Sequence, residues 1–335
     1  MDKVRFAVIG IEHRHIFGQV DPLLAAGAEL VSYHAAGFLL DWFKEKYPHA
    51  RPVDDARRIL EDKTIQLIVS AGVPSERAAL GIEAMRHGKD FMGDKPGVTT
   101  FEQLAAVRKV QAESKRIYSV CFSEHFETRS TVKAGELVHA GAIGRVIHTA
   151  GLGPHRLNKK TRPDWFFQRD KYGGILADIA SHQCEQFLFL TGADDAEVVA
   201  ATVANRANPD TPELQDFGDM LLRTKDVNGY ICVHWFTPDG LPTWGDGRLF
   251  IAGTEGAIEL RKYVDIGGAP GIDHLFVSDA KGVRRVDCSA VDLPYSRALI
   301  HDILAREETA MPQARCFKAM ELALTAQAMA ERAAK

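Results

Sequence analysis

An aspartate and a histidine stand four residues apart in the stretch YGGILADIASHQCEQFLFLTG, residues 172–192. Two glycines open this stretch, helix formers and apolar residues fill it, and Gly192 follows where helix ends favour a residue that tolerates positive φ. Because residues four apart share a helix face, Asp178, His182 and Glu185 line one stripe. A carboxylate and an imidazole can together bind and transfer protons. Such a pair is usually a weak exposed interaction, so other residues must decide whether it is a site.

The composition is that of an ordinary globular protein with more than one domain. At 335 residues the chain exceeds what one hydrophobic core usually supports. Hydrophobic residues make up 46% and charged residues 26% of the sequence, which is typical of soluble proteins. The formal net charge is −4 and the basic runs are short, so we expect no nucleic-acid partner.

The sequence also predicts a cytoplasmic location. The N-terminus enters an apolar run within three residues and has no secretory h-region with a cleavage site, and no stretch is long enough to span a bilayer. The five cysteines are scattered and never spaced as C-x-x-C, which favours reduced thiols that serve as small buried hydrophobes. We therefore expect a soluble protein that does not bind membranes.

The first third of the chain alternates strand-like and helix-like segments. Buried strands are predicted at residues 4–10, 28–34, 65–72, 90–96 and 117–123, and helices lie between them in the pattern. Ser75 is the predicted N-cap of one helix, and Thr99 or Thr100 caps the next. Alternating strands and helices with near-continuous apolar strands predict a doubly wound parallel sheet of the Rossmann type, which we place in a first domain of residues 1–122.

The second predicted domain, residues 123–335, has a different pattern. After a helix at 130–141 and the stretch that contains Asp178, strand-like segments follow one another at turn-length gaps, at 197–204, 217–225, 229–237, 248–260 and 282–289. A strongly helical segment, 316–335, closes the chain. The fold class is therefore α/β, with an N-terminal Rossmann-like domain and a C-terminal α+β domain built on a large, mainly antiparallel sheet.

The loop GIEHRH follows the first predicted strand. A dinucleotide-binding βαβ unit has G-x-G-x-x-G at this place, so that the backbone can turn tightly and approach a pyrophosphate. Here Gly10 is kept, but Glu12 and His15 replace the second and third glycines. The helix N-terminus would still attract an anion, with donors from His13, Arg14 and His15. The alternative is that Gly10 only forms a strand-to-helix turn.

The cofactor type is left open by the second strand. An NAD site would have an acidic residue near its end for the ribose hydroxyls, but this sequence has His34 there, followed by two alanines. The choice between NAD and NADP is therefore undetermined. His13 and His15 also raise the question of a metal ion, but with no third ligand close in the sequence we expect no metal site.

Taken together, the turn GDKPGVTT, the helix YGGILADIASHQ and the two-domain pattern resemble the Gfo/Idh/MocA oxidoreductases, the glucose-fructose oxidoreductase and inositol dehydrogenase family. The resemblance covers essentially the whole chain. The first family motif, an acidic residue then Lys-Pro, matches Asp94, Lys95 and Pro96, with Asp in place of the more usual Glu. The second motif, a glycine turn followed by Asp and His on a helix, matches Gly173, Gly174, Asp178 and His182. The departures are Glu12, His15 and His34, which bear on cofactor affinity and selectivity.

The resemblance implies an NAD(P)-dependent dehydrogenase that moves a hydride between the nicotinamide and a cyclic polyol, sugar or sugar-derived substrate. Oxidation of an alcohol releases a proton as well as a hydride, which suits a histidine base. The implied catalytic residues are Lys95, which would stabilise the alkoxide, Asp178, which would fix a substrate hydroxyl, and His182, the general acid/base. The implied cofactor-binding residues are Gly10, Ile11, His13, His15, His34, Val73, Pro74, Asp94, Lys95 and Pro96.

Substrate contacts are predicted from position in the chain. His125 follows the last strand of the first domain, where open α/β sheets carry ligand loops, and His155, Trp165 and Arg169 precede the helix of Asp178. His234, Trp235 and Trp244 are expected in the core or at a subunit interface. A homo-oligomer, dimer or tetramer, is an expectation from the family.

Two other functions fit the same sequence. One is a non-catalytic sensor of a ligand or dinucleotide, suggested by the altered glycine loop. The other is a glycoside hydrolase that recycles bound NAD, as in some relatives. Sustained substrate-dependent change in NAD(P)H would exclude the sensor, and aglycone release without NADH accumulation would identify the hydrolase.

Overall fold

The computed structural model describes residues 3–333 and divides the chain into two compact units. The first unit contains the residues up to Cys121, Asp170–Gly173 and Pro294–Phe317, and the second contains Phe122–Arg169, Gly174–Leu293 and the residues from Lys318. A late segment of the chain therefore folds with the first unit. The two contiguous domains proposed from the sequence, 1–122 and 123–335, stay a prediction.

The first unit is built on a six-stranded parallel sheet with the order β3-β2-β1-β4-β5-β6. The strands are β1 (Arg5–Ile9), β2 (Glu29–His34), β3 (Arg51–Pro52), β4 (Leu67–Ser70), β5 (Asp90–Asp94) and β6 (Tyr118–Cys121). This order reverses between β1 and β4, and in open α/β sheets ligands bind at the carboxyl ends of the strands beside such a reversal. The predicted doubly wound sheet is confirmed.

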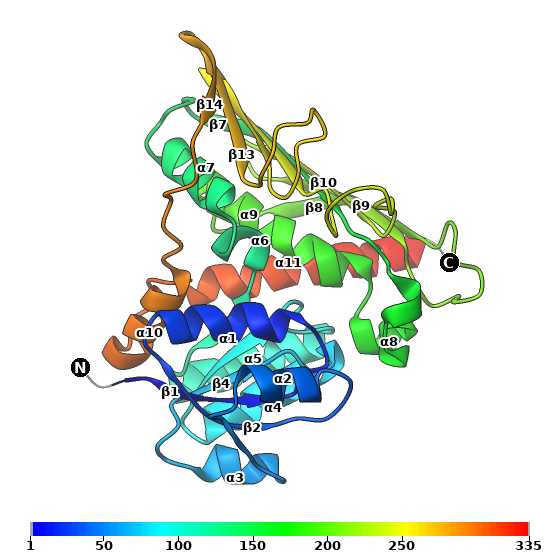
Figure 1. The fold of residues 1–335 in the computed structure, drawn as a ribbon. Helices are drawn as coiled ribbons and strands as arrows, with labels where there is room; N and C mark the ends of the chain where they lie inside the picture. The colour runs from blue at the N-terminus through cyan, green and yellow to red at the C-terminus, as the bar shows by residue number, and fades with distance from the viewer. Residues whose placement is uncertain (1–2, 334–335) are drawn as a thin grey trace. The chain divides into compact units, whose positions relative to one another are not determined.

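Helices lie between these strands in the chain and pack in the same unit, and two more come from its later segment. They are α1 (His15–Ala25), α2 (Leu40–Lys46), α3 (Ala56–Glu61), α4 (Pro74–Arg86), α5 (Phe101–Ser114) and α10 (Tyr295–Ala305), with the beginning of α11 (Gln313–Ala333). Within this unit α1 and α4 contact β4 and β5 (Figure 1). Phe6, Val8, Leu67, Val69 and Phe91 are fully buried between the layers. The apolar runs read as buried strands thus form the core.

The helix caps confirm one prediction and correct another. The Thr100 hydroxyl accepts a hydrogen bond from the N–H of Gln103 and caps α5. The prediction that Ser75 caps α4 is wrong, because the N-cap is Val73 and Pro74 is the first helical residue. Proline is favoured at that position because it has no N–H to satisfy and its φ is already helical.

The second unit is built on an eight-stranded sheet with the order β14-β13-β12-β11-β7-β10-β9-β8. The strands are β7 (Val146–Pro154), β8 (Glu197–Ala204), β9 (Phe217–Arg223), β10 (Asn228–His234), β11 (Arg248–Gly253), β12 (Gly256–Arg261), β13 (His274–Asp279) and β14 (Gly282–Val286). Neighbouring strands are antiparallel except β7 and β10, which are parallel. The predicted mainly antiparallel sheet is confirmed, although the sequence pattern identified neither β7 nor β13 as a strand.

Helices cover one face of this sheet. The unit contains α6 (Ser123–Phe126), α7 (Arg129–His139), α9 (Ser181–Thr191), the later part of α11, the 3-10 turns η1 (Lys159–Thr161) and η2 (Asp164–Phe167), and the π-helical turn η3 (Leu176–Ala180). A short helix, α8 (Arg169–Tyr172), joins the two units in sequence. Helices α7 and α9 contact the strands, and both lie on one side of the sheet (Figure 1). Large apolar side chains are exposed on other strand positions: Ile147, Val199, Leu221, Phe250 and Val283.

Among the helices in residues 3–333, none is both long enough and apolar enough to cross a bilayer. The five cysteines lie among the described residues and form no disulfide, and four of them, Cys121, Cys184, Cys288 and Cys316, are buried. The expectation of free thiols that act as small apolar side chains is therefore confirmed, while Cys232 is half-buried.

Candidate active site

The loop between β1 and α1 begins at a glycine that this position requires. Gly10 has a φ of +84°, and a Cβ added there would lie 3.0 Å from the Cα of Gly72, at the end of β4. The N–H of Ala71 donates to the Gly10 carbonyl, which holds the two loops together. The turns after β1 and β4 thus meet at the reversal of strand order, where a cradle for a phosphate group would form.

The side chain of Glu12 occupies this cradle. Its Oε2 atom lies 3.1 Å from the position of a Cβ on Gly10 and 3.4 Å from that of a Cβ on Gly72. Within residues 3–333, this buried oxygen has no hydrogen-bond partner. Burial raises the pKa of Glu12 above its ordinary value, although the backbone N–H groups of Glu12 and Ile11 act in the opposite direction. The carboxylate therefore stands where the second glycine of a dinucleotide-binding loop would leave room.

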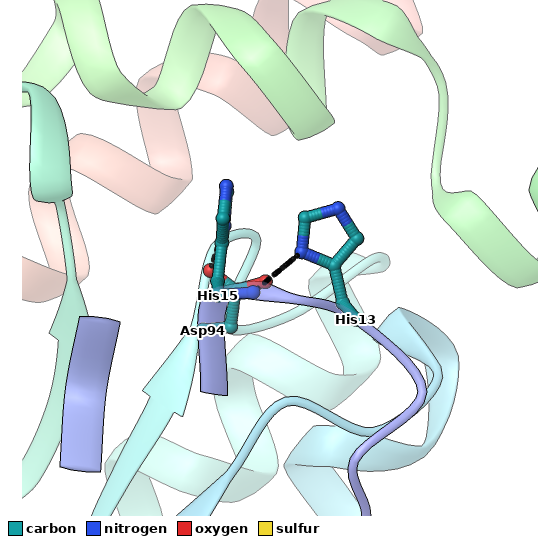
Figure 2. A group of neighbouring side chains, drawn as sticks. All are labelled: His13, His15 and Asp94. Carbon is teal, nitrogen blue, oxygen red and sulfur yellow. Dashed lines mark hydrogen bonds and ion pairs between the residues drawn. The ribbon is translucent and has the colours of Figure 1, made fainter. Parts of the chain in front are cut away.

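His13 and His15 gather around the carboxylate of Asp94, which ends β5 (Figure 2). The His15 Nδ1 lies 2.9 Å from Asp94 Oδ1, and the His13 Nδ1 lies 3.5 Å from Oδ2. Asp94 is only 2% exposed, whereas both imidazoles are half-buried. Burial alone would raise the pKa of Asp94, but His15 and Arg77 hold it well below its usual range. Asp94 is thus a buried anion.

Arg77, on α4, organises the turn that follows β5. Its buried guanidinium donates to the carbonyls of Asp94 and Pro96, at 3.0 and 3.1 Å, and to the carbonyl of Lys95. Its Nη2 also contacts Asp94 Oδ2 at 3.2 Å. The turn that carries the first family motif is thereby fixed, and Lys95 itself is 5% exposed. Sequence reasoning missed Arg77, because one arginine within an ordinary helical pattern gives no local sign of this role.

The other predicted cofactor residues lie at the carboxyl ends of the same sheet or in its loops. Ile11 is fully buried beside Gly10, and Val73 and Pro74 begin α4 after β4. His34 ends β2, and its ring Nδ1 lies within hydrogen-bond distance of the Val53 carbonyl, at 2.9 Å. The structure therefore brings Gly10, His13, His15 and Asp94 close together, and it places His34 on the neighbouring strand.

In the second unit, Asp178 and His182 lie on a buried and irregular helix. Asp178 belongs to the π-helical turn η3, and His182 lies in the first turn of α9. They are 7% and 1% exposed, so the pair is not the solvated surface interaction that its spacing alone suggested. The His182 ring packs edge-on against Phe122, with 6.0 Å between ring centroids. Burying two polar side chains costs free energy unless they form hydrogen bonds or ion pairs.

The same unit contains a buried ion pair that the sequence did not reveal. Lys262, in the residue after β12, donates from Nζ to Glu124 Oε2 at 2.6 Å and to Gln186 Oε1 at 2.8 Å. Gln183 Nε2 donates to the same Glu124 oxygen at 2.8 Å. Burial alone would raise the pKa of Glu124, but Lys262, then His182 and His155, lower it to about 2. Glu124 is therefore an anion that acts electrostatically on His182.

The glycine turn before η3 is required by packing. Gly174 has a φ of +89°, and an added Cβ would lie 2.2–2.5 Å from side-chain atoms of Gln327. The Gln327 Oε1 accepts a hydrogen bond from the N–H of Leu176 at 3.0 Å. The second family motif thus begins with a backbone that Gln327 holds in place.

The four predicted substrate residues all belong to the second unit, with different surroundings. The His125 Nδ1 pairs with buried Glu185 at 2.9 Å, and His155 stacks edge-on against Trp235 and Trp244 at 5.4 and 4.6 Å. Trp165 is half-buried in η2. The Arg169 guanidinium pairs with Glu331 of α11, which favours a structural role for that arginine. His234, Trp235 and Trp244 are respectively half-buried, buried and exposed.

Three comparisons relate the chain to known proteins. The family model described as GFO/IDH/MocA C-terminal domain matches residues 131–259. A D-xylose dehydrogenase of Paenarthrobacter nicotinovorans is 24% identical over 169 residues, which cover 49% of this chain. The match spans only 41% of that relative's length.

Solved structures resemble the whole chain. The crystal structure of a candidate oxidoreductase from Erwinia carotovora atroseptica is 43% identical, with a TM-score of 0.95 over 98% of this chain and 99% of the other. Levoglucosan dehydrogenase, in a complex with NADH and levoglucosan, has a TM-score of 0.78 at 18% identity over 99% of this chain and 98% of the other. At that identity the likeness concerns the fold. The domain match, the full-length relative and both sequence motifs agree, and the chain belongs to the Gfo/Idh/MocA oxidoreductase family.

Proposed function

We propose that this protein is an NAD(P)-dependent dehydrogenase that oxidises a CH–OH group of a cyclic polyol, sugar or sugar-derived substrate, or catalyses the reverse reduction. The observation that carries this proposal is the burial of Asp178 and His182 on one helix, with His182 in electrostatic contact with the anionic Glu124. Polar side chains that are buried near a charged residue are typical of a functional site. Two of the similar proteins are named D-xylose dehydrogenase and levoglucosan dehydrogenase, and these names support the same substrate class.

The dinucleotide site is proposed at the loop after β1. The cradle formed by Gly10 and Gly72 at the reversal of strand order fits a pyrophosphate, and Glu12 is the side chain that must move to admit it. We propose that Ile11, His13, His15, His34, Val73, Pro74, Asp94, Lys95 and Pro96 complete the site. When bound, the nicotinamide would accept the hydride from the substrate carbon. The binding of NADH by a relative of the same fold supports this part of the proposal.

The protein side chains would handle the proton and the charge. As the hydride leaves the alcohol carbon, the hydroxyl proton passes to His182 and the C–O bond becomes a carbonyl. Negative charge builds up on the oxygen during this step, and the ammonium group of Lys95 would stabilise it. Asp178 would accept a hydrogen bond from a neighbouring substrate hydroxyl. Glu124 would act through His182, because the two side chains interact electrostatically.

The experiment that tests this function combines binding with turnover. Calorimetric titration with NADH and with NADPH fixes the cofactor, and a polyol and sugar screen then follows the absorbance of NAD(P)H. Replacing His182 by Ala or Lys95 by Met should lower turnover by at least about a hundredfold while circular dichroism stays unchanged. Replacing exposed His49 by Ala serves as the control. Near-normal turnover in H182A or K95M would refute the assigned roles.

A non-catalytic sensor is the second candidate, and the position of Glu12 favours it. A carboxylate in the cradle of Gly10 and Gly72 opposes a pyrophosphate. If folded, nucleotide-free protein binds neither NADH nor NADPH, the sensor becomes the better proposal. Sustained, substrate-dependent reduction of NAD(P) would exclude it.

A further inference from the structure

Two histidines and one aspartate in the first unit offer the ligand set of a transition-metal ion. His13 and His15 come from the loop and helix start after β1, and Asp94 comes from the end of β5, so the carboxyl ends of two strands bring them together (Figure 2). Each residue offers one ligand atom, and these atoms lie within 4.8 Å of one another. Imidazole nitrogens with one carboxylate suit Zn²⁺, Co²⁺, Ni²⁺ and Fe²⁺.

The distances fit the size of such an ion. The His15 Nδ1 and Asp94 Oδ1 are 2.9 Å apart, and the His13 Nδ1 and Asp94 Oδ2 are 3.5 Å apart. Bonds of about 2.0–2.2 Å in a tetrahedral zinc site put ligand atoms roughly 3.3–3.6 Å from one another. Small side-chain adjustments would therefore be enough. We propose that His13, His15 and Asp94 form a binding site for a divalent transition-metal ion, with Zn²⁺ as the preferred probe.

The surroundings of Asp94 resemble those of a supported metal ligand. Its carboxylate is buried and its Oδ2 is held by the guanidinium of Arg77 at 3.2 Å, which fixes its orientation. Outer-shell partners of this kind orient metal ligands and are costly to remove. The metal would take the place of the hydrogen bond between His15 Nδ1 and Asp94 Oδ1, and it would displace the long hydrogen bond, 3.3 Å, from the His15 N–H to the His13 Nδ1.

The site would be open on one side. The side chains of His13 and His15 are 21% and 35% exposed, whereas that of Asp94 is 3% exposed. Three protein ligands with solvent beside them leave a fourth position for water or a ligand, as in zinc sites that are not purely structural. The inference goes beyond the proposed dehydrogenase activity and does not rest on it. Because the same residues are proposed to hold the dinucleotide, metal binding is measured without nucleotide.

The test is a zinc titration of tag-free, chelator-treated full-length protein against a chromophoric chelator. We expect one Zn²⁺ per chain, with affinity at least about tenfold lower in H13Q and in H15Q. The control is H301Q, because His301, Asp302 and Glu307 form the other group of potential ligands in residues 3–333. Unchanged affinity in H13Q and H15Q, loss of binding in H301Q, or no binding by the wild-type chain would overturn the proposal.

A measurement on the unaltered protein keeps the test independent of folding in the variants. X-ray absorption of the zinc-loaded wild-type chain should show two imidazole nitrogens among oxygen ligands. The Co²⁺-loaded chain should give the visible absorption of a four- or five-coordinate ion. A zinc ligand set with fewer than two imidazoles would overturn the proposal, whatever the variants show.

Discussion

At the residue scale, the two glutamates of the candidate sites differ in the charges around them. Burial acts on both carboxyls and by itself raises the pKa of each. Glu124 forms an ion pair with Lys262, and the pKa of Glu124 falls to about 2. In contrast, the buried oxygen of Glu12 has no hydrogen-bond partner in the described residues, and the pKa of Glu12 rises. The first carboxylate is thus a fixed anion, and the second is a poorly compensated side chain in a cradle.

We predict that E12G strengthens dinucleotide binding. The change restores the second glycine of the loop and removes a carboxylate that lies over Gly10 and Gly72. A tenfold gain in NADH affinity, about 1.4 kcal/mol, is expected by calorimetry. E12Q keeps the bulk but removes the charge, and so separates the two effects. Equal or weaker binding by E12G would show that Glu12 does not oppose the cofactor.

We also predict that Glu124 makes stability depend on pH in the acid range. Its pKa is lowered from 4.5 to about 2 in the folded protein, so its contribution is fully present above the unfolded value. That contribution decreases as the pH falls below 4.5 and is lost as the pH passes through about 2. The difference in urea midpoint between wild-type protein and E124Q should therefore shrink over this window. A difference that stays constant from neutral pH downwards would contradict the assignment.

At the element scale, the sequence predicted regular elements well and side-chain partners poorly. Apolar runs identified five strands of the first sheet, since buried parallel strands carry continuous hydrophobic residues, but not β3, whose two residues are exposed. In the second sheet β7 and β13 were missed, and Ser75 was predicted to cap α4, whose N-cap is Val73. Neither Arg77 nor Lys262 could be predicted, because each finds its carboxylate through the fold, Lys262 at a separation of 138 residues.

The turn before η3 gives a prediction with a matched control. G174A should destabilise the protein by more than about 2 kcal/mol, because φ is positive and the Cβ would overlap Gln327. Gly192 also has a positive φ, of +67°, but a Cβ there meets nothing within 4 Å. G192A should therefore cost only about 1 kcal/mol in the free energy of unfolding measured with urea. Equal losses in the two variants would exclude the steric role of Gln327.

At the scale of the whole molecule, both family motifs could be identified from the sequence, but the side chains that surround them in the fold could not. The neighbours of His13 and His15 include Asp94, which lies 79 residues from His15 in the chain. For this reason the local sequence gave no third metal ligand, and the histidines were assigned to the dinucleotide alone. Fold class and family were predictable because they depend on long-range patterns of hydrophobic residues and on two short motifs.

We propose that the chain forms homo-oligomers through the sheet face that α7 and α9 leave uncovered. Phe250, Leu221 and Val283 are 37%, 43% and 79% exposed on strands β11, β9 and β14. F250E should shift the mass measured by light scattering towards the monomer, whereas the exposed control Phe38→Glu, in the first unit, should not. An unchanged mass in F250E would place the contact elsewhere or show that there is none.

The inclusion of Pro294–Phe317 in the first unit bears on how the protein is made. Gln313 Oε1 accepts a hydrogen bond from the N–H of Tyr118 at 2.8 Å, and Arg306 pairs with Asp90 at 2.7 Å, so this later segment contacts strands β6 and β5 of the parallel sheet. During synthesis these contacts cannot form until the segment Pro294–Phe317 has left the ribosome, long after the strands of the sheet. A gene truncated before residue 294 would therefore encode every strand of the parallel sheet but an incomplete first unit, and limited proteolysis of stalled nascent chains would detect it.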